Sequence, residues 1–240
     1  MKIAVLFVGE YRTFPYCRKT MGFLDQLGID IDVYFHTWEI TKLHNPPIGR
    51  HLNPNQPKTS RPVSEEEIVD LLKRPAVIKV SPLPSDKDGF LIMRKGWLMG
   101  FEMVKASGIN YDYVYVLRPD LFFRKESSYF QDIPPGKYDN AIGFLPRPVG
   151  NSNIIADCDF FSTFLNIEKL LCDDVLSLDQ TSEGIHRAWF DYVMSKGFDL
   201  TLLPFLYKEP HSIARFPINA QTTYQEVNAN YWKLFHNILI

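Results

Sequence analysis

The sequence lacks the features of several large protein classes. No apolar run reaches the roughly 18 residues of a membrane-spanning helix, so we expect no membrane span. The 26 Lys and Arg residues nearly balance the 28 Asp and Glu residues, and the net charge is −2. Because there is no basic excess to attract a polyanion, we also expect no nucleic-acid partner.

Cysteine is scarce, and its placement excludes two further classes. The three residues, Cys17, Cys158 and Cys172, include no C-x-x-C pair. Their odd number argues against a disulfide framework and a structural zinc site. The first ten residues have a short apolar run without a small-residue cleavage site, which favours a β-strand over a secretory signal. These features predict a protein of a reducing, cytoplasmic compartment.

The apolar pattern predicts an α/β fold. The 240 residues are enough to bury a large core, and 45% of them are hydrophobic. Apolar runs at 2–8 and 31–35, with a helical pattern between them, are typical of two parallel strands joined by a helix. No linker divides the chain, so we predict one domain over 1–240 with a central, mostly parallel sheet flanked by helices. Further strands are predicted at 76–80, 111–117, 141–145 and 199–203, and helices at about 16–27, 64–74, 88–107, 161–171 and 183–196.

One segment interrupts this pattern. Residues 39–63 contain five prolines and several asparagines, and they predict a long loop or a lid. Ser64 and Glu67 follow with the spacing of a capping box, in which each residue would bond the other's backbone N–H. This pair therefore predicts the start of the next helix.

Ligands in open α/β sheets bind beyond the carboxyl ends of the strands, so residues that follow strands are the first candidates. After the first strand, Gly9 permits close backbone approach and Arg12 offers a guanidinium to a phosphate. A single glycine makes neither a dinucleotide fingerprint nor a P-loop. The alternative is a plain turn with an arginine on the surface.

The second strand ends in an imidazole, a hydroxyl and an indole. His36, Thr37 and Trp38 would suit stacking and hydrogen bonding to a base or ribose. Alternatively, Trp38 packs back on the core beside a hydrogen-bonded His36.

The most β-prone segment of the chain, 111–117, ends at Arg118-Pro119-Asp120. A carboxylate here could hold Mg²⁺ or Mn²⁺, which prefer oxygen ligands and could neutralise a departing diphosphate. The alternative is that Asp120 caps the next turn and pairs with Arg118.

Two other acidic pairs have the D-x-D spacing. Asp30 and Asp32 open the second strand, at its amino end, and we interpret them as part of a surface turn. Asp157 and Asp159 follow an apolar run and could face the same edge as Asp120, to bind a sugar or the metal. Alternatively, they cap a helix.

Three motifs together resemble a known family. Segments 9–14, 32–38 and 111–121 resemble, in order and spacing, small GT-A glycosyltransferases of bacterial surface-polysaccharide clusters and of large DNA viruses, including viruses of chlorella-like algae. The resemblance covers about residues 1–125. It implies a GT-A-like, Rossmann-like fold with a nucleotide-sugar-binding half at 1–125 and an acceptor-side half at 126–240.

The activity implied is transfer of a hexosyl or deoxyhexosyl group from a nucleotide-diphosphate sugar, such as a UDP-sugar, to a glycan or other hydroxyl acceptor. Polysaccharide biosynthesis would be its context, and Mn²⁺ or Mg²⁺ would assist the departing diphosphate. By resemblance, the nucleotide-binding residues are Val8, Gly9, Arg12, Thr37, Trp38, Arg94 and Arg118, and the metal-binding residues are Asp120 and His211.

The sequence departs from the family at one position. GT-A enzymes usually carry D-x-D, but Arg118 replaces the first aspartate here. Either Asp120 alone holds the metal, or Arg118 supplies part of the positive charge. An inverting transfer also needs a base for the acceptor hydroxyl. The candidates for this catalytic role are Asp159, Glu183 and Asp157, together with His186.

Two other functions are alternatives to glycosyl transfer. A sugar nucleotidyltransferase would need a Gly-rich loop or a lysine after the first strand, and neither is present. A non-catalytic carbohydrate-binding or scaffold protein on a degenerate GT-A frame is favoured by the missing aspartate.

Overall fold

The computed structural model describes residues 1–11, 14–18, 21–25, 28–44, 58–86, 88–122, 130, 133–146, 155–178, 185–202 and 212–213. The strands are β1 (Lys2–Val8), β2 (Asp30–Trp38), β3 (Ile40–His44), β4 (Lys58–Pro62), β5 (Ala76–Ser81), β6 (Tyr113–Leu117), β7 (Leu121–Phe122), β8 (Ala141–Pro146), β9 (Ile155–Thr163), β10 (Asp199–Leu202) and β11 (Ser212–Ile213). The α-helices are α1 (Phe14–Cys17), α2 (Glu65–Leu72), α3 (Gly89–Ala106), α4 (Phe164–Leu170) and α5 (Ile185–Ser195), with 3-10 turns η2 (Gly22–Asp25) and η4 (Asp173–Ser177).

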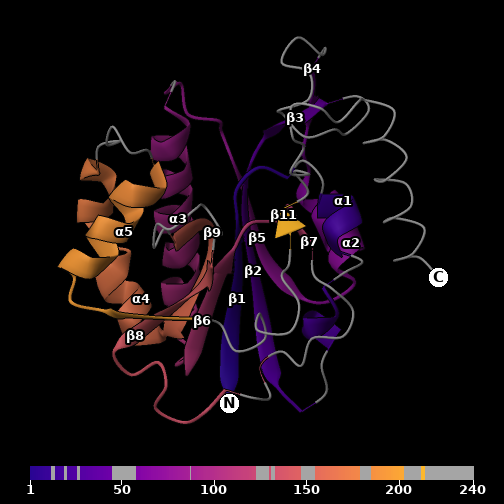
Figure 1. The fold of residues 1–240 in the computed structure, drawn as a ribbon. Helices are drawn as coiled ribbons and strands as arrows, with labels where there is room; N and C mark the ends of the chain where they lie inside the picture. The colour runs from indigo at the N-terminus through magenta and orange to yellow at the C-terminus, as the bar shows by residue number, and fades with distance from the viewer. Residues whose placement is uncertain are drawn as a thin grey trace, which may run out of the picture.

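A seven-stranded sheet forms the middle layer of the molecule. Its order is β10-β8-β9-β6-β1-β2-β5, and β9 alone runs antiparallel to its neighbours. Helices α3, α4 and α5 cover one face, and α1 and α2 cover the other (Figure 1). The predicted single α/β domain with a mostly parallel sheet is confirmed. The six parallel strands all end at one side of the sheet, which we call the carboxyl edge.

The continuous apolar run of β1 is explained by burial on both faces. Ile3, Val5 and Phe7 contribute to a core beneath α1 and α2, whereas Leu6 and Val8 contribute to a core beneath α3, α4 and α5. Alternate residues of an extended strand point to opposite faces, so both sets must be apolar.

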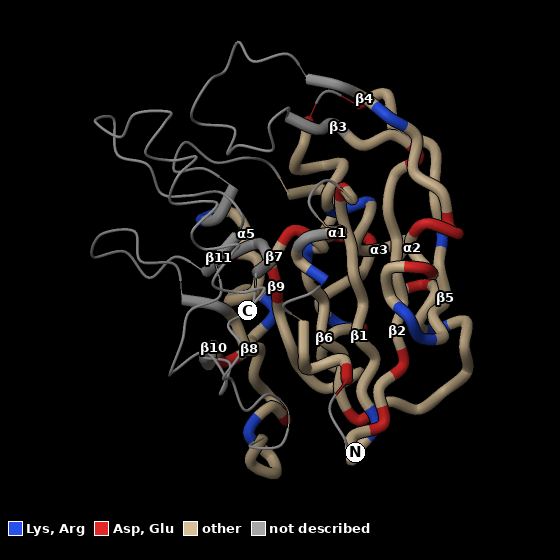
Figure 2. The backbone as a smooth tube through the Cα atoms, turned by 90° about the vertical axis from the view of Figure 1, so that its right-hand side faces the viewer, with Lys and Arg blue, Asp and Glu red and all other residues tan. Residues whose placement is uncertain are grey.

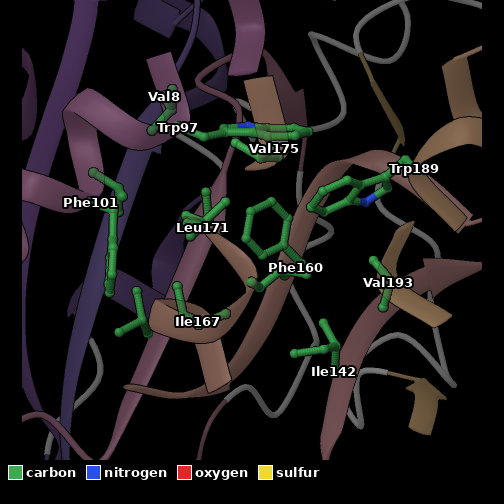
Figure 3. Packing of buried hydrophobic residues seen from close by; sticks show 14 of the residues in the cluster. Val8, Trp97, Phe101, Ile142, Phe160, Ile167, Leu171, Val175, Trp189 and Val193 are labelled. Atoms are coloured by element: carbon green, nitrogen blue, oxygen red, sulfur yellow. The ribbon is translucent and has the colours of Figure 1, made fainter. Parts of the chain in front are cut away.

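The core beneath α3, α4 and α5 is built around large rings (Figure 3). The Trp97 and Trp189 ring centroids lie 4.7 Å apart, and Phe160 packs edge-on against Trp97 at 5.4 Å. These three side chains come from α3, α5 and β9, so they join both halves of the chain in one core.

The structure corrects two predictions in the first sixty residues. The helix predicted at 16–27 is instead the four-residue α1 and the 3-10 turn η2. Gly22 lies in this stretch, and a glycine in a helix interior costs about 1 kcal/mol relative to alanine. The loop or lid predicted at 39–63 begins and ends as an antiparallel hairpin of β3 and β4. The β-branched Ile40 and Thr41 favour a strand there.

The second half holds a further correction. Asp157 and Asp159 lie within β9 and cap no helix, because β9 continues to Thr163 and Thr163 is the N-cap of α4. The helix predicted at 161–171 therefore starts later, at Phe164. Among the described residues, no helix combines the length and the apolar character required to cross a bilayer.

Candidate functional site

The loops after β1, β2 and β6 meet at the carboxyl edge. Gly9 has φ of 132°, a conformation that disfavours other residues, and its N–H donates to the His36 carbonyl at 3.2 Å. A Cβ at Gly9 would lie 3.6 Å from Cδ of Pro119. The first predicted loop therefore lies against the Arg118-Pro119-Asp120 motif.

The two charged residues of that motif form a forked ion pair. Arg118 Nε donates to Asp120 Oδ1 at 2.9 Å, and Nη2 donates to Oδ2 at 2.5 Å. The side chains of Arg118 and Asp120 are 15% and 6% exposed. Charge-assisted bonds in this parallel geometry are among the stronger hydrogen bonds in proteins. The alternative in which Asp120 pairs with Arg118 is thus what the structure contains.

This pairing bears on the predicted metal. Both carboxylate oxygens of Asp120 accept from Arg118, and no three His, Cys, Asp or Glu side chains gather as a metal site among the described residues. The described residues do not fit a divalent-metal site. Metal binding by Asp120 together with His211, which lies outside the described residues, stays a prediction.

Two side chains at the end of β2, His36 and Trp38, are buried beneath α3. His36 Nε2 lies 3.0 Å from Ser81 Oγ, and the His36 and Trp38 rings meet edge to face at 5.0 Å. Burial, together with the nearby Lys79 charge, lowers the pKa of His36 to about 4, so the imidazole is neutral at pH 7. Thr37 and Trp38 are also buried. Their contact with a nucleotide stays a prediction.

Close packing of α3 explains this burial. A Cβ at Gly96 would lie 3.0 Å from Val8 Cγ1 and 3.7 Å from His36 Nδ1, and a Cβ at Gly100 would lie 3.0 Å from Val8 Cγ2. The two glycines therefore let the helix rest directly on β1 and β2. Val8, another predicted nucleotide-binding residue, is enclosed by this contact.

Arg94 is held by backbone carbonyls. Its Nη1 donates to the Val175 carbonyl at 2.8 Å and to the Leu176 carbonyl at 3.1 Å. The guanidinium also lies over the Phe90 ring, 4.4 Å from its centroid. These contacts join α3 to η4, which is a packing role. Nucleotide binding by Arg94 stays a prediction.

Asp159 is buried on the face of the sheet that α1 and α2 cover, opposite to α3. It pairs with Leu117 across β6 and β9, and its carboxylate accepts from Tyr115 Oη at 2.9 Å. The residue has no exposed surface. A base must reach the acceptor hydroxyl, so a catalytic Asp159 would need access that this packing does not provide.

Several predicted residues lie outside the described part of the chain. They are Arg12, Glu183 and His211, and the same holds for the side chains of Asp157 and His186. The short strand β11 pairs with β7, which directly follows Asp120. Residues 212–213 are thus brought next to the ion pair from more than ninety positions along the chain.

Sequence reasoning missed one group near the carboxyl edge, which we call the Tyr11–Arg61–Glu67 cluster. Arg61 binds Glu67 through two bonds of 2.6 and 2.7 Å, and Tyr11 Oη donates to Glu67 Oε1 at 2.9 Å. Tyr11 lies within the 9–14 segment and Glu67 has the capping-box spacing, but neither pattern links these two residues to each other or to Arg61. A capping box does not predict partners in other segments.

Of the comparisons with known proteins, only the one with solved structures found a match. No known family profile matches the chain, and no curated protein matches it in sequence. Its structure is similar to that of apo-form glycosyltransferase GlyE from Streptococcus pneumoniae TIGR4, with a TM-score of 0.51 and 11% identity over 99% of this chain and 62% of that chain.

Two other solved structures are similar at lower scores. A second structure of GlyE has a TM-score of 0.49 at 12% identity, over 99% of this chain and 62% of that chain, and 4-diphosphocytidyl-2C-methyl-D-erythritol synthase has 0.48 at 8%, over 97% of both chains. The present chain thus spans about 62% of the length of GlyE. At these identities the likeness shows the fold alone. The likeness to the apo-form GlyE structure confirms the GT-A-like α/β fold predicted from the sequence.

Proposed function

We propose that this chain is a glycosyltransferase that uses a nucleotide-diphosphate sugar as its donor. The observation that carries the proposal is the meeting of Gly9, Pro119 and the Arg118–Asp120 ion pair at the carboxyl edge of the sheet. Ligands of open α/β sheets bind at this edge. The fold shared with GlyE supports the same assignment.

Arg118 would stabilise the departing nucleoside diphosphate. Cleavage of the sugar–phosphate bond leaves negative charge on the diphosphate, and a guanidinium already fixed in place stabilises that charge without reorganising. Asp120 would orient Arg118 through its two bonds. Gly9 would let the phosphates approach the backbone beside Pro119, because it carries no side chain.

The finer specificity belongs to the proposal as well. A UDP-linked hexose or deoxyhexose as donor and a glycan hydroxyl as acceptor, in polysaccharide synthesis, are what the family resemblance implies. The base that deprotonates the acceptor hydroxyl would come from the 126–240 half. Because Asp159 is buried, Glu183 and Asp157 are the preferred candidates.

The test is calorimetric titration of the chain with UDP, GDP and dTDP, each in Mn²⁺ and in EDTA. We expect one nucleoside diphosphate to bind, and to bind in EDTA within about threefold of its affinity in Mn²⁺, because Arg118 supplies positive charge at the site. Absence of binding by all three under both conditions would overturn the proposal. Binding that requires Mn²⁺ would restore the predicted metal site.

One observation favours a second candidate, a non-catalytic carbohydrate-binding protein. Both oxygens of Asp120 are engaged by Arg118, so the carboxylate that would hold a catalytic metal is already paired. This candidate would be selected by glycan binding that is unchanged by nucleotide and by metal. Hydrolysis of any nucleotide-sugar by the chain would exclude it.

A further inference from the structure

Glu67 departs from the pattern that marked it in the sequence. The Glu67 backbone N–H donates to Ser64 Oγ at 3.2 Å, which is the first half of a capping box. Its carboxylate, which would complete the box by returning to the backbone of Ser64, instead binds Arg61 and Tyr11. The carboxylate is therefore committed to two other segments of the chain.

The contacts within the cluster are strong and mutually supporting. Arg61 donates from Nη1 and Nη2 to the two oxygens of Glu67, and its guanidinium lies 5.3 Å from the centroid of the Tyr11 ring. These hydrogen bonds hold the pKa of Glu67 below its ordinary value, so the carboxylate stays ionised at neutral pH. Tyr11 is fully buried, and its ring packs on Phe14.

The three side chains join segments that flank the proposed donor site. Tyr11 lies two positions after Gly9, in the loop that follows β1, and Arg61 lies in β4. The hairpin of β3 and β4 stands over the carboxyl edge, beside the ends of β2 and β5 (Figures 1 and 2). Its base is tied down by bonds from Glu39 N–H to the Ser81 carbonyl and from Val63 N–H to the Glu39 carbonyl.

We infer that Glu67 is a positioning residue for donor binding, which acts through Tyr11 on the loop after β1 and through Arg61 on the β3–β4 hairpin. The inference rests on the proposed function. Glu67 fixes the loop and the hairpin relative to one another from α2, an element that follows both in the chain. Without its charge, the nucleoside diphosphate would meet a loop and a hairpin that move independently.

The test compares Glu67→Gln with Glu102→Gln. Glu102 on α3 forms an ion pair of the same length with Lys105, 2.6 Å, but α3 covers the other face of the sheet from α2 (Figure 1). We expect Glu67→Gln to weaken binding of UDP, GDP or dTDP, whichever the wild-type chain binds, by about tenfold, a coupling within the usual range for such networks. Glu102→Gln should change it by less than about twofold.

Kinetics distinguish positioning from general stability. In donor hydrolysis, Glu67→Gln should raise KM with kcat within about twofold of wild type, the signature of lost binding that is equal in ground and transition states. Arg61→Gln combined with Glu67→Gln should be no worse than either change alone, because the residues act as one unit. If Glu67→Gln does not fold, Tyr11→Phe replaces it in the test. This variant removes only the hydroxyl and should raise KM in the same way but by a smaller factor.

Hydrogen exchange without nucleotide separates this inference from the proposed function. Amides at 9–11, 40–44 and 60–61 should exchange faster in Glu67→Gln than in Glu102→Gln. Equal exchange, or wild-type nucleotide affinity in Glu67→Gln, overturns the inference. Absence of nucleotide binding by the wild-type chain instead overturns the proposed function, and the exchange rates still decide whether Glu67 holds the loop and hairpin together.

Discussion

The two edges of the sheet both carry an acidic motif, and they differ in what surrounds it. At the amino edge, Asp30 and Asp32 have the D-x-D spacing but are 63% and 37% exposed, and Lys2 Nζ lies 3.4 and 3.3 Å from them. At the carboxyl edge, Asp120 is nearly buried and takes a forked arginine. Exposed lysine pairs contribute little, whereas a desolvated fork is strong and directional. The candidate site is therefore distinguished from the surface pair by its place at the carboxyl ends of the strands, and not by the spacing of its acidic residues.

The largest effect should come from removing the cation at the carboxyl edge. Arg118→Gln should lower kcat/KM for donor hydrolysis by about 10²–10³-fold, the usual loss when a preorganised donor to a developing charge is removed. Lys2→Gln removes a cation at the amino edge and should change it by less than about twofold. Steady-state kinetics on both variants provide the comparison. Equal losses of kcat/KM in the two variants would show that Arg118 has no special role in donor hydrolysis.

Acid should expose a second difference between the edges. The buried His36 has a folded pKa of about 4, below its ordinary value of 6.5, so the unfolded chain binds a proton more readily between these values. Stability is therefore complete above about pH 6.5 and falls as the pH drops towards 4. Each tenfold difference in proton affinity is worth about 1.4 kcal/mol, so the total loss approaches about 3 kcal/mol.

Urea unfolding at several pH values measures this loss. His36→Gln should abolish the slope between pH 6.5 and about 5, above the range in which carboxylates titrate, because glutamine does not titrate. Asp32→Asn, at the amino edge, should retain the slope. A wild-type chain with constant stability over that interval would contradict the buried, neutral imidazole.

The smallest of the three effects concerns the helix that covers the end of β2. Gly96→Ala would place a methyl 3.0 Å from Val8 Cγ1, and Val8 cannot turn away because its other methyl lies against Gly100. We expect a net loss of about 1–2 kcal/mol, since overpacking outweighs the better helix propensity of alanine. Gly89→Ala, where a Cβ meets nothing within 4 Å, should be neutral or slightly stabilising. Thermal unfolding of both variants tests this, and a stabilised Gly96→Ala would show that α3 can lift from the sheet.

Much of the fold was predictable because it depends on local patterns. Continuous apolar runs such as 2–8 indicate strands buried on both faces, and the side chains after such strands must lie at one edge. The assignment of Asp30 and Asp32 to the amino end follows from the same reasoning and is confirmed. The surface turn predicted there is wrong, because both residues are paired with β1 within β2. The hairpin of β3 and β4 was not predictable, since proline-rich composition conceals the pairing of 40–44 with 58–62.

The candidate site was predictable in place but not in detail. Chain order and strand periodicity are local properties, so the sequence alone predicts that Gly9 and Asp120 follow strands of one sheet and that Trp38 lies at the end of another strand. The partners of the charged side chains depend instead on the folded chain: Arg94 binds the carbonyls of η4, Asp159 binds Tyr115, and Glu67 binds Arg61. A charged group takes the partners that become available when distant segments meet and water is excluded, and a one-dimensional pattern does not specify those partners.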